Sequence, residues 1–330
     1  MLKFFKGTGP GVIFLIAILS GALWLKAFLN PQMAGAAYFE TNPMPLYGII
    51  QSIIGINPLS GVIFSFLILI IILFLLVNFN TSVFFINERT FLPAVIYLLF
   101  SALFPEIQVI NPVLPAVLFL LLAFIRIMDA YRKPGIAYNF FDAAMLISIG
   151  SLIYTNLIWF GLLLIVGIAL LRTGNIKEIA LCITGLAVPY ILTFGLFYVL
   201  GKDIGVFLSD IHYNLFGESP GYAFTRQSII ILIYLGLLII ISIGYLYLQM
   251  NSKKIKSRKT FYLLLWSFFV TVVLYLAIPT ISVEIIWIAG IPTTYFLTNY
   301  FVFVKKKLVP EILFTGLLLL ILFLQWFTVF

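Results

Sequence analysis

Eleven long apolar segments, almost free of charged residues, follow one another along the chain and constrain its fold more than any other feature. A helix needs about 20 apolar residues to cross the hydrocarbon core of a bilayer, and most of these segments come close to that length. The third to sixth are shorter, at about 14 to 16 residues, which suits helices that tilt little or lie among other helices. The sequence therefore predicts an all-α, polytopic integral membrane protein with about eleven transmembrane helices. The predicted spans are residues 11–29, 59–79, 91–104, 112–127, 140–154, 157–171, 179–200, 228–249, 261–278, 285–304 and 312–330.

The composition supports the same class. Hydrophobic residues make up 63% of the chain, charged residues 9%, and the mean hydropathy is +1.20. A soluble domain carries about 25% charged residues, so lipid must cover much of this apolar surface. The formal net charge of +8 comes from bases in short links between spans, which indicates membrane orientation and not a nucleic-acid partner. The single cysteine, Cys182, lies inside an apolar segment and cannot form an intramolecular disulfide.

The distribution of Lys and Arg predicts the orientation. If the N-terminus is cytoplasmic, 16 of the 19 basic residues fall on the cytoplasmic side. Only Lys26, Lys202 and Arg226 fall outside. Positive charge is enriched in cytoplasmic loops, so we expect an inner-membrane protein with an external C-terminus.

Residues 30–58 form the first long outer loop, which holds one charged residue, Glu40. Within it, residues 45–56 carry apolar side chains at helical spacing but are too short to span, so we expect a helix lying along the outer interface. We divide the chain into a membrane module at residues 1–226 and a C-terminal four-helix extension at residues 227–330, within a single membrane domain overall.

The outer side is where chemistry is expected. Glu40 and Glu106 could take a proton from an acceptor hydroxyl or hold a divalent cation between them. Basic side chains could offset charge that develops on a phosphate leaving group. Each of these residues also has an ordinary structural explanation, as a capping, turn or surface residue. The candidate phosphate-binding residues are Lys26, Lys202, His212 and Arg226, and the other outer acids are Asp203, Asp210, Glu218 and Glu284.

Several activities are disfavoured. The chain has no Gly-rich phosphate loop, no CxxC motif and no histidine cluster. One histidine cannot build a His-based metal site, so no such site is predicted. ATP hydrolysis and redox chemistry are therefore poor candidates.

The order of parts resembles the GT-C superfamily of polyprenyl-phosphate-sugar glycosyltransferases. The stretch AVIYLLFSALFPEIQVINPVLPAVLFLLLAFIRI looks like that family's third and fourth spans, and LISIGSLIYTNLIWFGLLLIVGIALLR is similar to its later hairpin. The resemblance implies transfer of a sugar from a polyprenyl phosphate to an outer-face acceptor. It places the catalytic acid at Glu40 and the second outer-loop acid at Glu106.

Two other classes stay open at this point. One is a non-enzymatic membrane subunit or scaffold for envelope assembly, and the other is a transporter or lipid flippase. Apart from the bilayer and a polyprenyl-phosphate lipid, the sequence names no partner.

Overall fold

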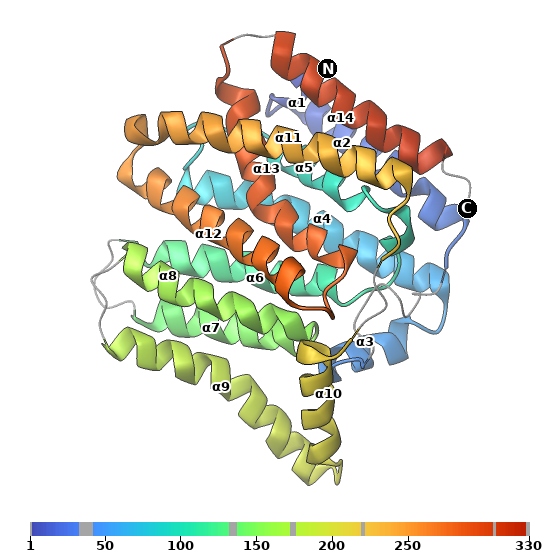
Figure 1. The fold of residues 1–330 in the computed structure, drawn as a ribbon, viewed down its shortest axis with the longest axis vertical. Helices are drawn as coiled ribbons and strands as arrows, with labels where there is room; N and C mark the ends of the chain where they lie inside the picture. Colours follow the sequence, from blue (N-terminus) through green and yellow to red (C-terminus); the bar gives the residue numbers. More distant parts are fainter. Residues whose placement is uncertain are drawn as a thin grey trace.

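The computed structural model describes residues 2–32, 42–131, 137–171, 176–218, 222–305 and 308–327. Within these ranges the chain is helical and has no strand (Figure 1). The helices are α1 (Leu2–Phe5), α2 (Pro10–Leu29), α3 (Pro45–Ile54), α4 (Pro58–Val83), α5 (Leu92–Ser101), α6 (Val113–Asp129), α7 (Ala137–Ser151), α8 (Leu162–Leu171), α9 (Ile176–Val199), α10 (Ile204–Phe216), α11 (Arg226–Gln249), α12 (Ile255–Ala277), α13 (Ile286–Phe303) and α14 (Leu308–Phe327). Four 3₁₀ turns join them: η1 (Pro105–Ile107), η2 (Thr155–Gly161), η3 (Met250–Ser252) and η4 (Val283–Ile285).

Each of the eleven predicted apolar segments contains a helix. Among the described residues, seven helices are long and apolar enough to cross a membrane: α2, α4, α9, α11, α12, α13 and α14. The other four, α5 to α8, have 10, 17, 15 and 10 residues. The all-helical class is confirmed, while eleven crossings and the GT-C-like arrangement remain predictions.

Local sequence explains where several helices begin. Proline stands in the first turn of α2, α3, α4 and α5, where its missing N–H costs nothing. The Asn57 side chain accepts a hydrogen bond from the Leu59 N–H at 2.9 Å and so caps α4. Asp203 caps α10 in the same way through the Gly205 N–H at 2.7 Å. Between α9 and α10 the chain reverses at Gly201, whose φ of +64° favours glycine.

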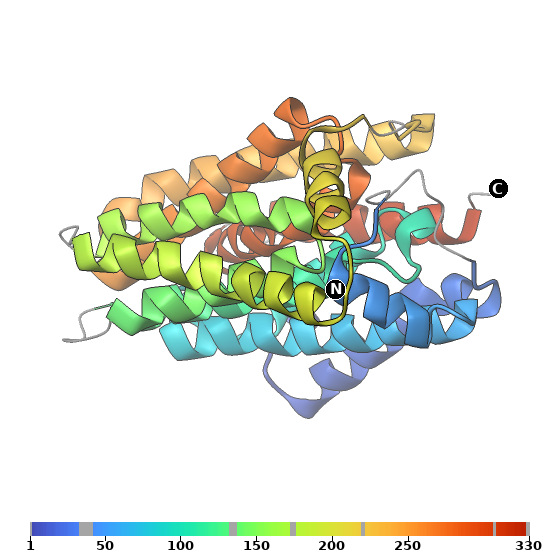
Figure 2. The same ribbon diagram turned by 90° about the horizontal axis from the view of Figure 1, so that it is seen from below.

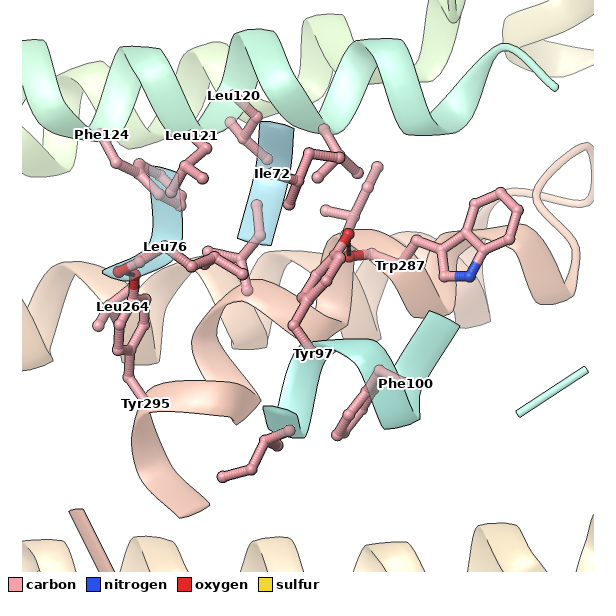
Figure 3. Packing of buried hydrophobic residues seen from close by; sticks show 14 of the residues in the cluster. Ile72, Leu76, Tyr97, Phe100, Leu120, Leu121, Phe124, Leu264, Trp287 and Tyr295 are labelled. Carbon is pink, nitrogen blue, oxygen red and sulfur yellow. Dashed lines mark hydrogen bonds between the residues drawn. The ribbon is translucent and has the colours of Figure 1, made fainter. Parts of the chain in front are cut away.

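The centre of the molecule is formed by α5 and α13. Every residue of α5 is buried, and α13 packs against α5, α6, α11 and α12. The Tyr97 hydroxyl donates to the Trp287 carbonyl at 3.0 Å, and the Tyr295 hydroxyl donates to the Leu76 carbonyl at 2.8 Å (Figure 3). A Cβ atom added at Gly290 would lie 3.0 Å from the Tyr97 ring, so glycine permits this close packing.

Burial accounts for the unusual composition of α13. Its span has a mean hydropathy of 1.2, the lowest of the seven, and 83% of it is buried within the protein. The helix carries Thr293, Thr294, Thr298 and Asn299, and the Thr293 and Thr298 hydroxyls donate to carbonyls one turn earlier, whereas the buried Thr294 hydroxyl has no partner among the described residues. Because protein and not lipid surrounds this helix, its polar side chains can be satisfied by hydrogen bonds.

The helix α9 shows the opposite environment. Only 17% of its span is buried, and Ile183, Ile191, Leu192 and Leu196 are all exposed. Exposed leucine and isoleucine along a whole helix face are favourable in lipid and costly in water. We therefore expect this face of the molecule to contact lipid.

Two short helices lie close together at one end of the bundle. In Figure 1, α3 and α10 lie at the lower right, at the end where α9 finishes. The helix predicted over residues 45–56 is confirmed as α3, although its position along a membrane interface remains a prediction. By contrast, the sequence predicts no helix between the spans at residues 179–200 and 228–249, where the structure has α10.

The main hydrophobic core includes residues from Leu2 to Leu324. Helices on both sides of residue 226 contribute to it, and α13 and α14 contact helices from the first part of the chain. The orientation of the termini relative to a membrane remains a prediction.

Candidate functional site

Glu40, the predicted catalytic acid, lies outside the described residues. The described chain resumes at Asn42, which is held firmly by α10. The Asn42 side chain donates to an Asp210 carboxylate oxygen at 2.9 Å, and its backbone carbonyl accepts from the Asn214 side chain at 2.8 Å. These bonds fix the chain two residues after Glu40 to the α10 helix.

Glu106, the second predicted acid, lies in η1 between α5 and α6. The side chain is half-buried, and one of its carboxylate oxygens is buried without a hydrogen-bond partner among the described residues. Burial raises the pKa of the Glu106 carboxyl above its usual value, while its own backbone N–H and the positive charge of Lys26 act in the opposite direction. Lys26 is half-buried in the last turn of α2. The structure therefore brings Lys26 and Glu106 close enough to interact.

The other three predicted phosphate-binding residues are exposed. Lys202 lies in the turn before α10, with its ammonium 5.3 Å from the centre of the Phe197 ring. His212 lies on α10 with its ring against Phe216, at 5.5 Å between centroids. Arg226 is the first residue of α11. No hydrogen bond or ion pair joins these three residues to Glu106 in the described part of the chain.

A buried acid that the sequence did not single out, Glu284, lies in η4 just before α13. One of its carboxylate oxygens accepts from the Tyr154 hydroxyl at 3.2 Å and from the Ser282 N–H at 3.0 Å. Its other oxygen is buried and has no partner among the described residues. Glu284 is fully buried, which is unusual for a carboxyl group without a cationic partner.

Polar contacts continue from η2, beside Glu284, to α10. The Asn156 side chain donates to the Asn214 carbonyl at 3.2 Å and to the Thr280 hydroxyl at 3.5 Å. The Asn214 side chain also donates to the Thr155 hydroxyl at 3.1 Å. These bonds connect η2, α10, the 280–284 segment and Asn42. The burial of Asn156 and Asn214 is hard to predict from the sequence, because Asn and Asp between apolar segments are typical of exposed loops.

An apolar cavity of about 220 Å³ lies near these residues. Phe104, two residues before Glu106, lines it together with Phe224, two residues before Arg226. Tyr275 also lines the cavity and lies close enough to Glu284 for an electrostatic interaction. The cavity surface is apolar, so it suits the hydrocarbon part of a ligand. The remaining lining residues are Leu232, Thr271, Val272, Leu276, Val283, Ile285, Ile286 and Ala289.

The described residues contain no group of three or more His, Cys, Asp or Glu side chains that could hold a metal ion. A cation between Glu40 and Glu106 is not tested by this finding, since Glu40 lies outside the described ranges.

The described residues are all-helical and include seven helices long and apolar enough to cross a membrane, which places the chain in the class of multi-pass membrane proteins. More particularly, the chain belongs to a family of unknown function, DUF6427, whose model matches residues 43–330. The match includes Glu106, Lys202, His212, Arg226 and Glu284. No curated protein and no solved structure matches the chain.

Proposed function

We propose that this protein transfers a sugar from a polyprenyl phosphate to an acceptor at the end of the bundle where α3 and α10 lie. One observation carries the proposal: the half-buried Glu106 carboxylate interacts with Lys26 and follows a residue that lines an apolar cavity. A lipid phosphate needs an apolar surface for its hydrocarbon chain and a positively charged side chain for its phosphate. A sugar acceptor needs a carboxylate to position its hydroxyl group or to take the hydroxyl proton as its oxygen bonds to the sugar.

The order of helices agrees with the proposed resemblance. A long helix, α2, is followed by short α3 and long α4, then by the short helices α5 to α8, and then by α9 and α10. This is the order on which the likeness to GT-C glycosyltransferases rests. In this proposal Glu40 is the general base, and Glu106 positions the acceptor hydroxyl or a divalent cation. Lys26 contacts the phosphate, and Lys202, His212 or Arg226 closes over it when the donor binds.

The test is a comparison of envelope glycans in the source organism. A strain lacking the gene should lose a glycan mass that the wild-type gene restores. Glu106→Gln keeps the shape of the side chain and removes its charge, so it should fail to restore that glycan at normal expression. We expect a loss of about 10²–10⁴ in rate if a general base is lost, and Glu40→Gln should show it. Glu88→Gln is the matched control, because Glu88 is exposed in the link between α4 and α5.

A second candidate is a non-enzymatic membrane subunit. The exposure of Lys202, His212 and Arg226 favours it, since a subunit needs no convergent site. In that case Glu40→Gln and Glu106→Gln would both restore the glycan fully, while deletion of the gene would still remove it.

A further inference from the structure

The helix α10 exposes several large apolar side chains, alongside exposed Ser209 and His212, while Phe207 packs against the protein. Asn214 is buried and Asp210 half-buried, and both bond to Asn42. On the outside, Leu208 is 52% exposed and Phe216 is 59% exposed. A helix on the surface of a soluble protein turns mainly polar residues to water, so the exposed leucine and phenylalanine of α10 indicate another environment.

The position of α10 places these apolar side chains near the edge of a bilayer. The preceding helix, α9, has 24 residues, so it is about 36 Å long and exceeds the roughly 30 Å of a hydrocarbon core. Its last residues must therefore reach the headgroup level if the helix spans. A short turn at residues 200–203 follows, and α10 starts at that same level.

The orientation of α10 is also consistent with a position in the headgroup region. In both Figure 1 and Figure 2, α10 runs across the long helices, while α9 runs with them. The side of α10 that carries Phe207 and Ile211 packs onto Phe194 and Phe197 of α9. A helix fixed in this way extends along the plane of a membrane surface and not through it.

The apolar surface of α10 continues the lipid-facing surface of α9. Leu196, Tyr198 and Leu200 are exposed at the end of α9, and Val206 and Leu208 follow on α10. The outer surface of α10 also carries Tyr213, an exposed aromatic residue of the kind enriched at membrane interfaces. Lys202 lies in the turn with its ammonium 5.3 Å from the centre of the Phe197 ring, and its long side chain can extend to the headgroups.

We infer that α10 is an interfacial helix, inserted into the headgroup region of the same bilayer that surrounds α9, with Leu208 and Phe216 in contact with lipid. This inference does not depend on sugar transfer. If α10 lies in the headgroup region, the hydrogen bonds that link Asn42, Asn214 and Asn156 lie there too. Under the proposed function, this places them at the level of the lipid phosphate.

Site-directed spin labelling in nanodiscs tests the placement. Cys182, the only cysteine of the chain, is replaced by alanine, and single cysteines are introduced by Leu208→Cys and Phe216→Cys. Leu196→Cys on α9 is the lipid reference, and Glu88→Cys is the water reference. Relaxation is measured with oxygen, which concentrates in lipid, and with a nickel chelate, which stays in water.

We expect labels at residues 208 and 216 to be severalfold more accessible to oxygen, relative to the nickel chelate, than the label at residue 88. Their values should approach the value for residue 196. A water-like ratio at both positions would overturn the inference. So would protection from both reagents, because a protein partner or a second copy of the chain would then cover α10.

Discussion

The Glu106 carboxyl group, in the turn between α5 and α6, experiences two opposing influences. Burial favours its neutral form and raises its pKa, while its own backbone N–H and the neighbouring Lys26 charge favour the ionised form. Positioning an acceptor hydroxyl or a cation requires the ionised carboxylate. Under the proposed function, the ionised fraction of Glu106 therefore sets how much of the protein is active at a given pH.

This balance gives a prediction for the pH dependence of transfer. Activity should fall as the pH decreases through the raised pKa of Glu106, because the inactive protonated form then accumulates. Lys26→Met removes a charge that lowers this pKa, so the acidic limb of the pH–rate profile should move to higher pH. Lys254→Met, at an exposed position outside the proposed site, is the control and should leave the limb in place. An acidic limb that does not move in Lys26→Met would contradict the role given to this pair.

Lys253, at the opposite end of the bundle, gives a prediction for stability. Its ammonium donates to the Asn299 side chain at 2.6 Å and lies about 5 Å from the Phe261 and Phe303 ring centres. Burial lowers the pKa of Lys253 from 10.5 to about 8. Between these two values the unfolded chain holds a proton that the folded chain has lost, so this residue makes stability rise with pH.

The measurement is thermal unfolding in detergent at pH 8 and pH 10, for the wild type and for Lys253→Met. The wild type should gain more stability between the two pH values than the variant does. An equal change in both proteins would show that Lys253 does not titrate in this window.

At the scale of helices, the apolar segments predicted where the long helices lie, because lipid and core burial select the same side chains. They could not predict which helix lies at the centre. The threonines and the asparagine of α13 can be read in the sequence. They indicate a central helix only when the structure shows that α5 packs beside them. The helix α10 was missed because Asp210 and Asn214 face inward, which interrupts the usual amphipathic pattern.

The close packing of α5 and α13 predicts a cost for adding volume at Gly290. Gly290→Val places a Cβ atom 3.0 Å from the Tyr97 ring, with two methyl groups beyond it. Overpacking of this kind costs about 1–3 kcal/mol, so the melting temperature should fall. Gly236→Val in α11 is the control, since a Cβ atom there meets nothing within 4 Å. Equal melting temperatures for the two variants would argue against this packing.

The attachment of α10 predicts an effect of Asn214→Ala. The substitution removes the donor to the Asn42 carbonyl and to the Thr155 hydroxyl, and each lost hydrogen bond costs about 0.5–1.5 kcal/mol. Backbone amides of residues 204–216 should then exchange hydrogen faster. Ser209→Ala is the control, because the Ser209 hydroxyl is exposed and bonds only within α10. Unchanged exchange in Asn214→Ala would mean that these bonds do not hold the helix.

At the scale of the whole molecule, the sequence identified part of the candidate site. Glu106 could be selected because it is a lone acid at the tip of a short apolar hairpin, and Lys26 because it lies near the end of the first span. Glu284 could not be selected, since its burial depends on contacts with Tyr154, more than a hundred residues away in the chain. Whether Glu40 joins Glu106 is a prediction about residues beyond the described ranges.

The central claim is that this protein binds a polyprenyl phosphate beside Glu106. The most direct test is native mass spectrometry of the protein purified from its own membrane in mild detergent, followed by release and identification of the bound lipid. The account predicts a polyprenyl phosphate or its sugar derivative at close to one per protein, retained in Glu106→Gln and reduced in Lys26→Ala. Recovery of bulk phospholipids alone, in the same amounts from the wild type and from Lys26→Ala, would contradict it.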